Sequence, residues 1–100
     1  CLYIGIKKVK PGIRLGEIGK AIGAHANQNN CSVVRDYCGH GIGLKFHTTP
    51  NVVHYDDGAV DKSPVLEAGM TFTIEPMINL GGFEVATSKV DGWTVTTKDR

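Results

Sequence analysis

The run from Gly69 to Glu75 constrains the fold more than any other segment, because its apolar and polar side chains alternate. The apolar residues Met70, Phe72 and Ile74 alternate with the polar residues Thr71, Thr73 and Glu75. Successive side chains of a strand point to opposite faces, so the run predicts a strand with one face in a core. Pro76 follows and cannot donate a ladder hydrogen bond, so pairing should end directly after the carboxylate.

The rest of the chain predicts a small α+β domain with helices packed on a largely antiparallel sheet. Residues 1–10 end in lysines before Pro11-Gly12, and we expect them to form a short helix. A second, amphipathic helix is expected to begin near Ile13 and to end within the asparagine-rich residues 27–30. Further strands are expected at residues 32–37, 51–55 and 93–97, with a loop at 56–68 and a hairpin-like turn at Gly81-Gly82.

The second helix carries a row of glycines one residue away from its apolar positions. The apolar residues are Leu15, Ile18 and Ile22, and the glycines are Gly16, Gly19 and Gly23. Each glycine costs roughly 1 kcal/mol relative to alanine inside a helix. Such a row either lets the helix backbone come close to a neighbouring sheet or simply makes a weak helix, and both interpretations stay open.

Composition excludes several classes of function. A chain of 100 residues with 41% hydrophobic and 21% charged residues fits one globular domain. The formal net charge of +1, without a basic stripe, gives no reason to expect direct binding of nucleic acid. No apolar run approaches the roughly 20 residues of a membrane span, and the 3 cysteines lack the spacing of a disulfide framework. These features favour a soluble protein of a reducing compartment, the cytoplasm.

Metal chemistry is expected where one histidine stands in a glycine loop, whose backbone can adopt unusual dihedral angles, and one carboxylate stands on a rigid strand. His40 lies between Gly39 and Gly41, and Glu75 lies on the polar face of the alternating run beside Thr73. An imidazole nitrogen and a carboxylate are ligands suited to a borderline divalent metal ion. The threonine hydroxyl would be an outer partner that orients the carboxylate.

Each of these residues, taken alone, also has a simpler interpretation. His47, which follows Phe46, is able to donate a hydrogen bond to a substrate amide or an oxyanion, or it is a half-buried structural histidine. His40 is alternatively a turn histidine bonded to backbone. Glu75 is alternatively a solvated side chain on an exposed sheet face.

Other reactive side chains give weaker signals. Cys38 lies two residues before the glycine-flanked histidine, which raises the idea of a thiol activated by imidazole, but no third group orients the base. The adjacent Asp56 and Asp57 fit solvated turn residues better than a carboxylate pair. His25 and His54 have no partners in the sequence and are given no chemistry.

Three segments carry motifs in a common order. Residues 37–47 read Tyr-Cys-Gly-His-Gly-Ile-Gly-Leu-Lys-Phe-His, residues 69–77 read Gly-Met-Thr-Phe-Thr-Ile-Glu-Pro-Met, and residues 91–94 read Asp-Gly-Trp-Thr. Together they resemble the type I methionine aminopeptidases. The resemblance implies the pita-bread fold, in which residues 1–100 would form the carboxyl-terminal half of a peptidase M24-like catalytic domain, truncated at both ends.

The resemblance also implies a reaction. Members of this family remove the initiator methionine from nascent polypeptides, by hydrolysis with a water that bridges two divalent metal ions, here Mn, Fe, Co or Zn. The implied partners are the N-terminal methionine of nascent peptides and the ribosome. The implied site residues are His40 and Glu75 as metal ligands, Thr73 behind them, His47 as the catalytic residue at the scissile amide, and Phe46 and Trp93 around the methionine side chain.

The family's remaining ligands lie in segments that this chain does not contain, so the chain alone is expected to be inactive. Two alternatives remain: a non-catalytic pita-bread protein that binds protein or nucleic acid, and an Xaa-Pro-type aminopeptidase of the same fold. The presence of His40, Glu75 and His47 argues against the first alternative. Phe46 and Trp93 argue against the second.

Overall fold

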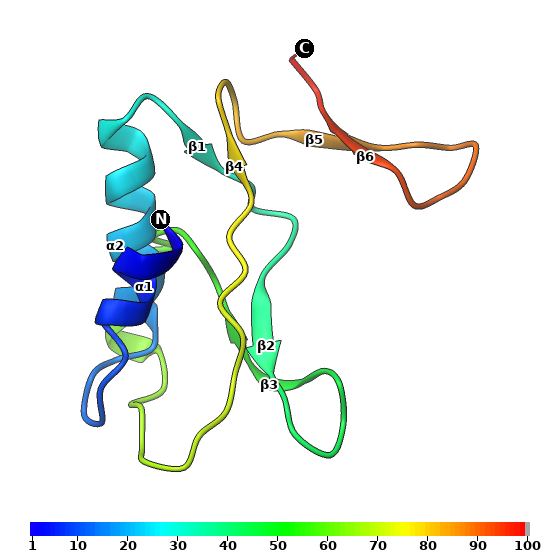
Figure 1. Ribbon diagram of the computed structural model, residues 1–100. Helices are drawn as coiled ribbons and strands as arrows, with labels where there is room; N and C mark the ends of the chain where they lie inside the picture. Colours follow the sequence, from blue (N-terminus) through cyan, green and yellow to red (C-terminus); the bar gives the residue numbers. More distant parts are fainter. Residues whose placement is uncertain (100) are drawn as a thin grey trace.

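The computed structural model describes residues 1–99 and has helices on one side and paired strands on the other (Figure 1). Helices α1 (Leu2–Lys7) and α2 (Gly16–Gln28) lie side by side. Helix α2 contacts strand β1 (Ser32–Val33), strand β3 (Thr48–Val52) and a short 3-10 helix, η1 (Val60–Lys62). Within the described residues, none of the helices combines the length and apolar character needed to cross a bilayer.

The strands form three separate antiparallel pairs rather than the one largely antiparallel sheet that the sequence predicts. Strand β1 pairs with β4 (Ile78–Asn79), and β2 (Gly39–Gly41) pairs with β3. Strands β5 (Val85–Thr87) and β6 (Val95–Thr97) form a hairpin that projects away from the helices (Figure 1). The α+β class and the antiparallel pairing are confirmed, with the strands divided among three two-stranded sheets.

Helix α2 starts at Gly16, later than the expected Ile13, because the residues before it bond to a distant segment. The Leu15 N–H donates to the Pro64 carbonyl oxygen at 2.8 Å, which ties the chain to the loop that follows η1. The Ser63 hydroxyl oxygen accepts the Gly16 N–H at 2.9 Å and so satisfies one free donor of the first helical turn. The start of the helix is therefore set by tertiary contacts that its own sequence does not encode.

The glycine row of α2 is explained by close packing. A Cβ atom on Gly19 would lie 2.5 Å from the Val53 carbonyl oxygen, and one on Gly23 would lie 3.3 Å from the Tyr55 Cα. The helix backbone therefore lies directly against the segment that follows β3. The apolar side of the same helix builds the core, whose buried members are Leu15, Ile18, Ile22, Ala26, Val33, Val52 and Leu66.

Most of the predicted strands are shorter than expected or shifted. Only Ser32–Val33 of residues 32–37 pairs, and the strand expected at 51–55 begins and ends earlier, at Thr48–Val52. The strand expected at 93–97 begins at Val95. Gly81-Gly82 connects β4 to β5, which pair with other strands, so this turn does not close a hairpin.

The alternating run from Gly69 to Glu75, expected to be the most regular strand, is extended but forms only one isolated antiparallel bridge, between Phe72 and Gly41. Its side chains are sorted much as predicted, because Phe72 and Ile74 pack against the core. Met70 is the exception and stays exposed.

The ladder between this run and β2 is interrupted because a side chain replaces a backbone acceptor. The Thr73 N–H donates to the His40 carbonyl oxygen at 2.7 Å, as in an ordinary antiparallel pair. The His40 N–H, however, donates to the Thr73 hydroxyl oxygen at 3.0 Å. The irregularity therefore places a hydroxyl group beside the histidine.

Candidate metal centre

Strand β2 holds His40 between two neighbouring segments, and the histidine is only 7% exposed. A Cβ atom on Gly39 would collide with the Thr73 carbonyl oxygen, and one on Gly41 would collide with the Thr49 carbonyl oxygen. Neither glycine has a positive φ. The two glycines are therefore required by crowding from backbones on both sides, and the unusual dihedral angles that such a motif suggests are absent at these two positions.

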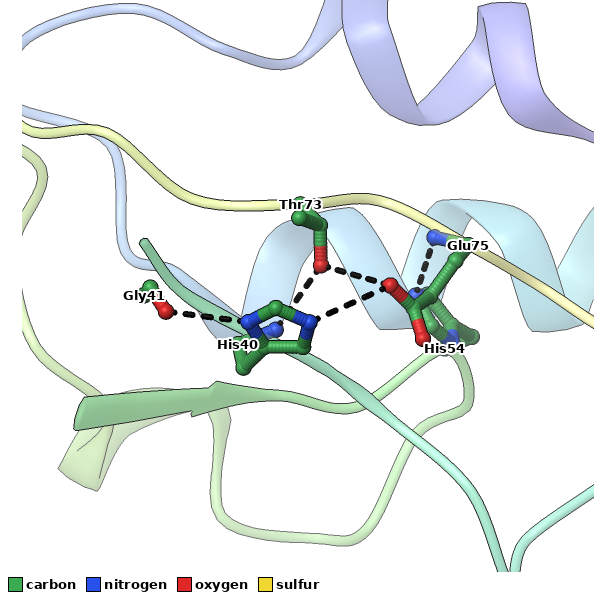
Figure 2. Close-up of polar contacts among 5 residues, drawn as sticks. All are labelled: His40, Gly41, His54, Thr73 and Glu75. Atoms are coloured by element: carbon green, nitrogen blue, oxygen red, sulfur yellow. Dashed lines mark hydrogen bonds and ion pairs between the residues drawn. The ribbon is translucent and has the colours of Figure 1, made fainter. Parts of the chain in front are cut away.

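The His40 ring has a defined tautomer. Its Nδ1 atom lies 2.9 Å from the Gly41 carbonyl oxygen, and because a carbonyl only accepts, the ring proton must be on Nδ1. The other ring nitrogen, Nε2, lies 3.5 Å from the Glu75 Oε2 atom (Figure 2). A histidine that donates through one nitrogen to a carbonyl while offering the other is the usual arrangement of a metal ligand.

Thr73 links the two candidate ligands. Its hydroxyl donates to Glu75 Oε2 at 2.8 Å and accepts the His40 N–H at 3.0 Å (Figure 2). The Glu75 side chain is 51% exposed and the His40 side chain 9%, so the carboxylate meets solvent above a buried imidazole. The hydroxyl thus restrains a carboxylate that packing alone leaves partly free.

The donor set fits a cation. His40 Nε2 and Glu75 Oε2 face each other at the distance of an ion pair, so a positive charge, either a proton on Nε2 or a bound metal ion, fits between them. Nitrogen and oxygen ligands bond a divalent ion at roughly 2.0–2.2 Å, so a shared ion separates them by roughly 3–3.6 Å. The observed 3.5 Å lies in that range. Within residues 1–99, no group of three or more histidine, cysteine or acidic side chains converges on such a site.

His47 and Phe46 lie beside His40. The His40 and His47 ring centroids are 4.1 Å apart, and Phe46 contacts His47 edge-on at 4.4 Å. An open depression of about 430 Å³ lies here, lined by His40, His47, Glu75, Tyr37 and Cys38 together with β3 residues. The structure therefore joins three of the predicted site residues in one depression, and Phe46 stands next to it.

Trp93 is not among the residues that line this depression. It lies in the turn of the β5–β6 hairpin and is 83% exposed. The Asp91 carboxylate shapes that turn by accepting the Trp93 N–H at 2.9 Å, the Thr94 N–H at 3.0 Å and the Thr94 hydroxyl. Within this chain, the indole and the histidine cluster are thus separate features.

His54, for which the sequence predicts no chemistry, contacts the site directly. Its Nε2 atom accepts the Glu75 N–H at 3.1 Å, and its side chain is fully buried at 1% exposure (Figure 2). Burial lowers the pKa of His54, and the nearby Glu75 carboxylate opposes part of this shift. The only sequence signal was a histidine within the apolar stretch Val52-Val53-His54-Tyr55.

The remaining candidates have the simple roles expected for them. Asp56 and Asp57 each accept a backbone N–H two residues ahead, from Gly58 and Ala59, as turn residues do. Cys38 is a partly buried free thiol at the edge of the depression.

Comparison with protein families explains this combination of residues. Residues 1–97 match the family model described as metallopeptidase family M24. The chain belongs to this family. Over 99 residues it is 62% identical to the methionine aminopeptidase of Salmonella typhimurium and 57% identical to that of Escherichia coli K12. These alignments take in 99% of the chain and 36% of each relative, so the chain spans about a third of their length.

Solved structures agree with this assignment. The chain superposes on the methionine aminopeptidase of Rickettsia prowazekii with a TM-score of 0.85 at 47% identity, covering 98% of this chain and 40% of that one. The methionine aminopeptidase of Thermotoga maritima gives a TM-score of 0.90 at 40% identity, covering 98% and 38%. The predicted resemblance to methionine aminopeptidases, with their pita-bread fold, is confirmed.

Proposed function

We propose that the protein containing this chain is a metal-dependent aminopeptidase that removes the initiator methionine from nascent polypeptides. Membership of family M24 implies dependence on a divalent metal, and the similar proteins are named methionine aminopeptidases. The observation that carries the proposal is the approach of His40 Nε2 to Glu75 Oε2 at 3.5 Å, with His40 Nδ1 bonded to the Gly41 carbonyl oxygen. Residues 1–100 would supply the carboxyl-terminal half of the catalytic domain.

In this proposal His40 and Glu75 help to hold two divalent ions, drawn from Mn, Fe, Co or Zn. Bound ions of this kind polarise a scissile carbonyl and acidify a water molecule. Thr73 keeps the Glu75 carboxylate turned toward His40 through its 2.8 Å hydrogen bond. Such outer partners commonly change metal affinity by about 10–100-fold.

His47 is the proposed catalytic side chain of this half. It is exposed beside the buried His40 ring, at a centroid distance of 4.1 Å, so it can reach a peptide bound over the metal ligands. An N–H from its ring would stabilise the oxyanion that develops on the scissile carbonyl. Phe46 and Trp93 would contact the methionine side chain, whose thioether and methylenes favour an aromatic surface.

The 100-residue chain by itself would be inactive, because its described residues bring only two metal ligands together. The test is an assay of the isolated chain on Met-Gly peptides with added Mn²⁺ or Co²⁺. We expect no turnover above the metal blank. Robust turnover would show that two ligands suffice and would overturn this part of the proposal.

The activity itself is tested on the full-length protein with Met-Ala and Xaa-Pro peptides in the presence of each metal. Release of methionine from the Met-Ala peptide, without cleavage of the Xaa-Pro peptide, supports the proposal. Cleavage before proline would instead identify an Xaa-Pro-type aminopeptidase, and lack of hydrolysis with every metal would identify a non-catalytic relative. The Glu84→Gln variant, whose exposed carboxylate pairs with Lys98 away from the site, serves as a matched control.

The proposed place of action is the cytoplasm, where nascent chains carry the substrate. An association with the ribosome would deliver these chains, whereas direct binding of nucleic acid or of a membrane is not expected. Co-sedimentation of the full-length protein with ribosomes, repeated after nuclease treatment of free RNA, tests this association.

A further inference from the structure

We infer that His54 is a positioning residue, which fixes the main chain of Glu75 and thereby the distance between the two candidate metal ligands. The inference rests on the proposed function, because the distance matters only if Glu75 binds a metal. The contact that carries it is the hydrogen bond from the Glu75 N–H to His54 Nε2, 3.1 Å long.

The Glu75 N–H needs this acceptor because ordinary strand pairing does not reach it. The extended run makes its single bridge at Phe72, and Pro76 follows Glu75 without an N–H of its own. A partly buried donor left without a partner destabilises the fold. His54 therefore replaces the missing ladder bond at the residue that carries the carboxylate.

His54 is itself held from the opposite side. It lies between Val53 and Tyr55, whose carbonyl oxygens pack onto the backbone of α2 at Gly19. Val52, just before it, is fully buried in the core. The imidazole therefore connects the main chain of Glu75 to a segment that is packed against α2 and follows β3.

Glu75 is consequently restrained at two points by two different side chains. Thr73 holds the carboxylate oxygen Oε2 at 2.8 Å, and His54 holds the backbone nitrogen at 3.1 Å. Half of the Glu75 side chain is exposed, so packing alone does not fix its position. Removal of the His54 acceptor should free the main chain and weaken metal binding, even while the Thr73 contact remains.

The test compares two substitutions of His54 in the full-length protein, with Mn²⁺ affinity measured by isothermal titration calorimetry. His54→Leu fills the space without an acceptor, and we expect it to bind Mn²⁺ at least about tenfold more weakly. His54→Gln offers an amide oxygen near the Nε2 position, so its affinity should stay within about threefold of the wild type. Equal affinity of His54→Leu and the wild type would overturn the inference.

A matched control separates positioning from general loss of stability. Ile22→Ala removes a fully buried side chain of α2 that lies against Gly5 of α1, and it is expected to destabilise the protein. It should lower the thermal midpoint and leave Mn²⁺ affinity unchanged. If Ile22→Ala weakens Mn²⁺ binding as much as His54→Leu does, His54 acts only through stability and the inference is wrong.

A measurement on the wild-type protein decides the matter even if His54→Leu fails to fold. Nitrogen NMR should show the His54 proton on Nδ1 and a coupling between the Glu75 amide and His54 Nε2, and absence of that coupling overturns the inference. Failure of the proposed function gives a different result from failure of the inference. If the wild-type protein shows the coupling but neither binds Mn²⁺ nor releases methionine, both the proposed function and the inference are wrong. If the wild type and His54→Leu bind Mn²⁺ equally well, only the inference is wrong.

Discussion

The residues expected to bind metal and those expected to recognise the substrate are held in opposite ways. His40 is 7% exposed and is fixed by hydrogen bonds from its main chain and its ring. Phe46 and Trp93 are 70% and 83% exposed, and they are placed by local turns. The chain therefore fixes the candidate ligand His40 through its own contacts, whereas its aromatic surfaces are too open to enclose a ligand unaided.

The largest expected effect comes from changing the exposed carboxylate that lies next to the buried His40. Glu75→Gln removes the charge but keeps an oxygen that can accept the Thr73 hydroxyl, so the fold should survive. In the full-length enzyme we expect kcat/KM for a Met-Ala peptide to fall by more than about 100-fold, together with loss of bound metal measured by mass spectrometry. Activity within tenfold of the wild type would remove Glu75 from the ligand set.

The second effect separates the two regions. His47→Ala deletes an exposed ring beside His40 and should lower kcat by about 100-fold, the usual cost of losing an oxyanion donor. Because His47 is not proposed to bind metal, Mn²⁺ affinity should stay at the wild-type value. If the variant lost metal affinity together with activity, His47 would instead belong to the residues that bind the metal.

A smaller effect is expected from the hydroxyl that joins the ligands. Thr73→Val keeps the shape but removes the bonds to His40 and Glu75, so Mn²⁺ affinity should fall by about tenfold. Thr73→Ser retains the hydroxyl and should restore most of the affinity. If the serine variant is as weak as the valine variant, the methyl group rather than the hydroxyl matters.

The exposed aromatic residues should affect substrate binding more than chemistry. Phe46→Ala and Trp93→Ala are each expected to raise KM for a Met-Ala peptide by up to about tenfold, with kcat little changed. Leu44→Ala, at a fully exposed position of the same β2–β3 connection as Phe46, should leave KM unchanged. A wild-type KM in the Trp93 variant would show that, of these two aromatic residues, only Phe46 in the β2–β3 connection contributes to binding the methionine side chain.

The smallest effect concerns the turn that carries Trp93. Hydrogen bonds from the Thr94 hydroxyl and from the Trp93 and Thr94 amides lower the pKa of Asp91 from 3.8 to about 2. The turn should be fully stabilised above pH 3.8 and should lose this contribution as the pH falls toward 2. Carbon NMR of the Asp91 carboxyl group should give a midpoint near 2, and a midpoint near 3.8 would show that the turn is open in solution.

The sequence could predict which candidate site residues lie together better than it could predict the backbone that positions them. His40, Glu75 and Thr73 stand in motifs with a fixed spacing, and alternation alone placed Thr73 and Glu75 on one face. The regular strand predicted at residues 69–75 is wrong because Thr73 and His54 side chains take backbone bonds that a ladder would use. Period-two patterns record burial and contain no information on such substitutions.

The role of His54 could not be predicted because its partner is a backbone group. A backbone N–H has no identity in the sequence, so a histidine that accepts one looks like any buried histidine. The late start of α2 has the same origin, since Ser63 and Pro64 satisfy its first turn from far along the chain. Hydrogen bonds between a side chain and a distant backbone group are therefore the features of this fold that local sequence patterns cannot predict.

The absence of a side chain at Gly19 affects the positions of His54 and Glu75. The helix lies so close to Val53 and Tyr55 that one added methyl group would push this segment outward, and His54 with it. The shift would reach the Glu75 amide through a single hydrogen bond. In the proposed metal site, the spacing between α2 and the Val53–Tyr55 segment would therefore influence the position of Glu75 and the affinity for a cation.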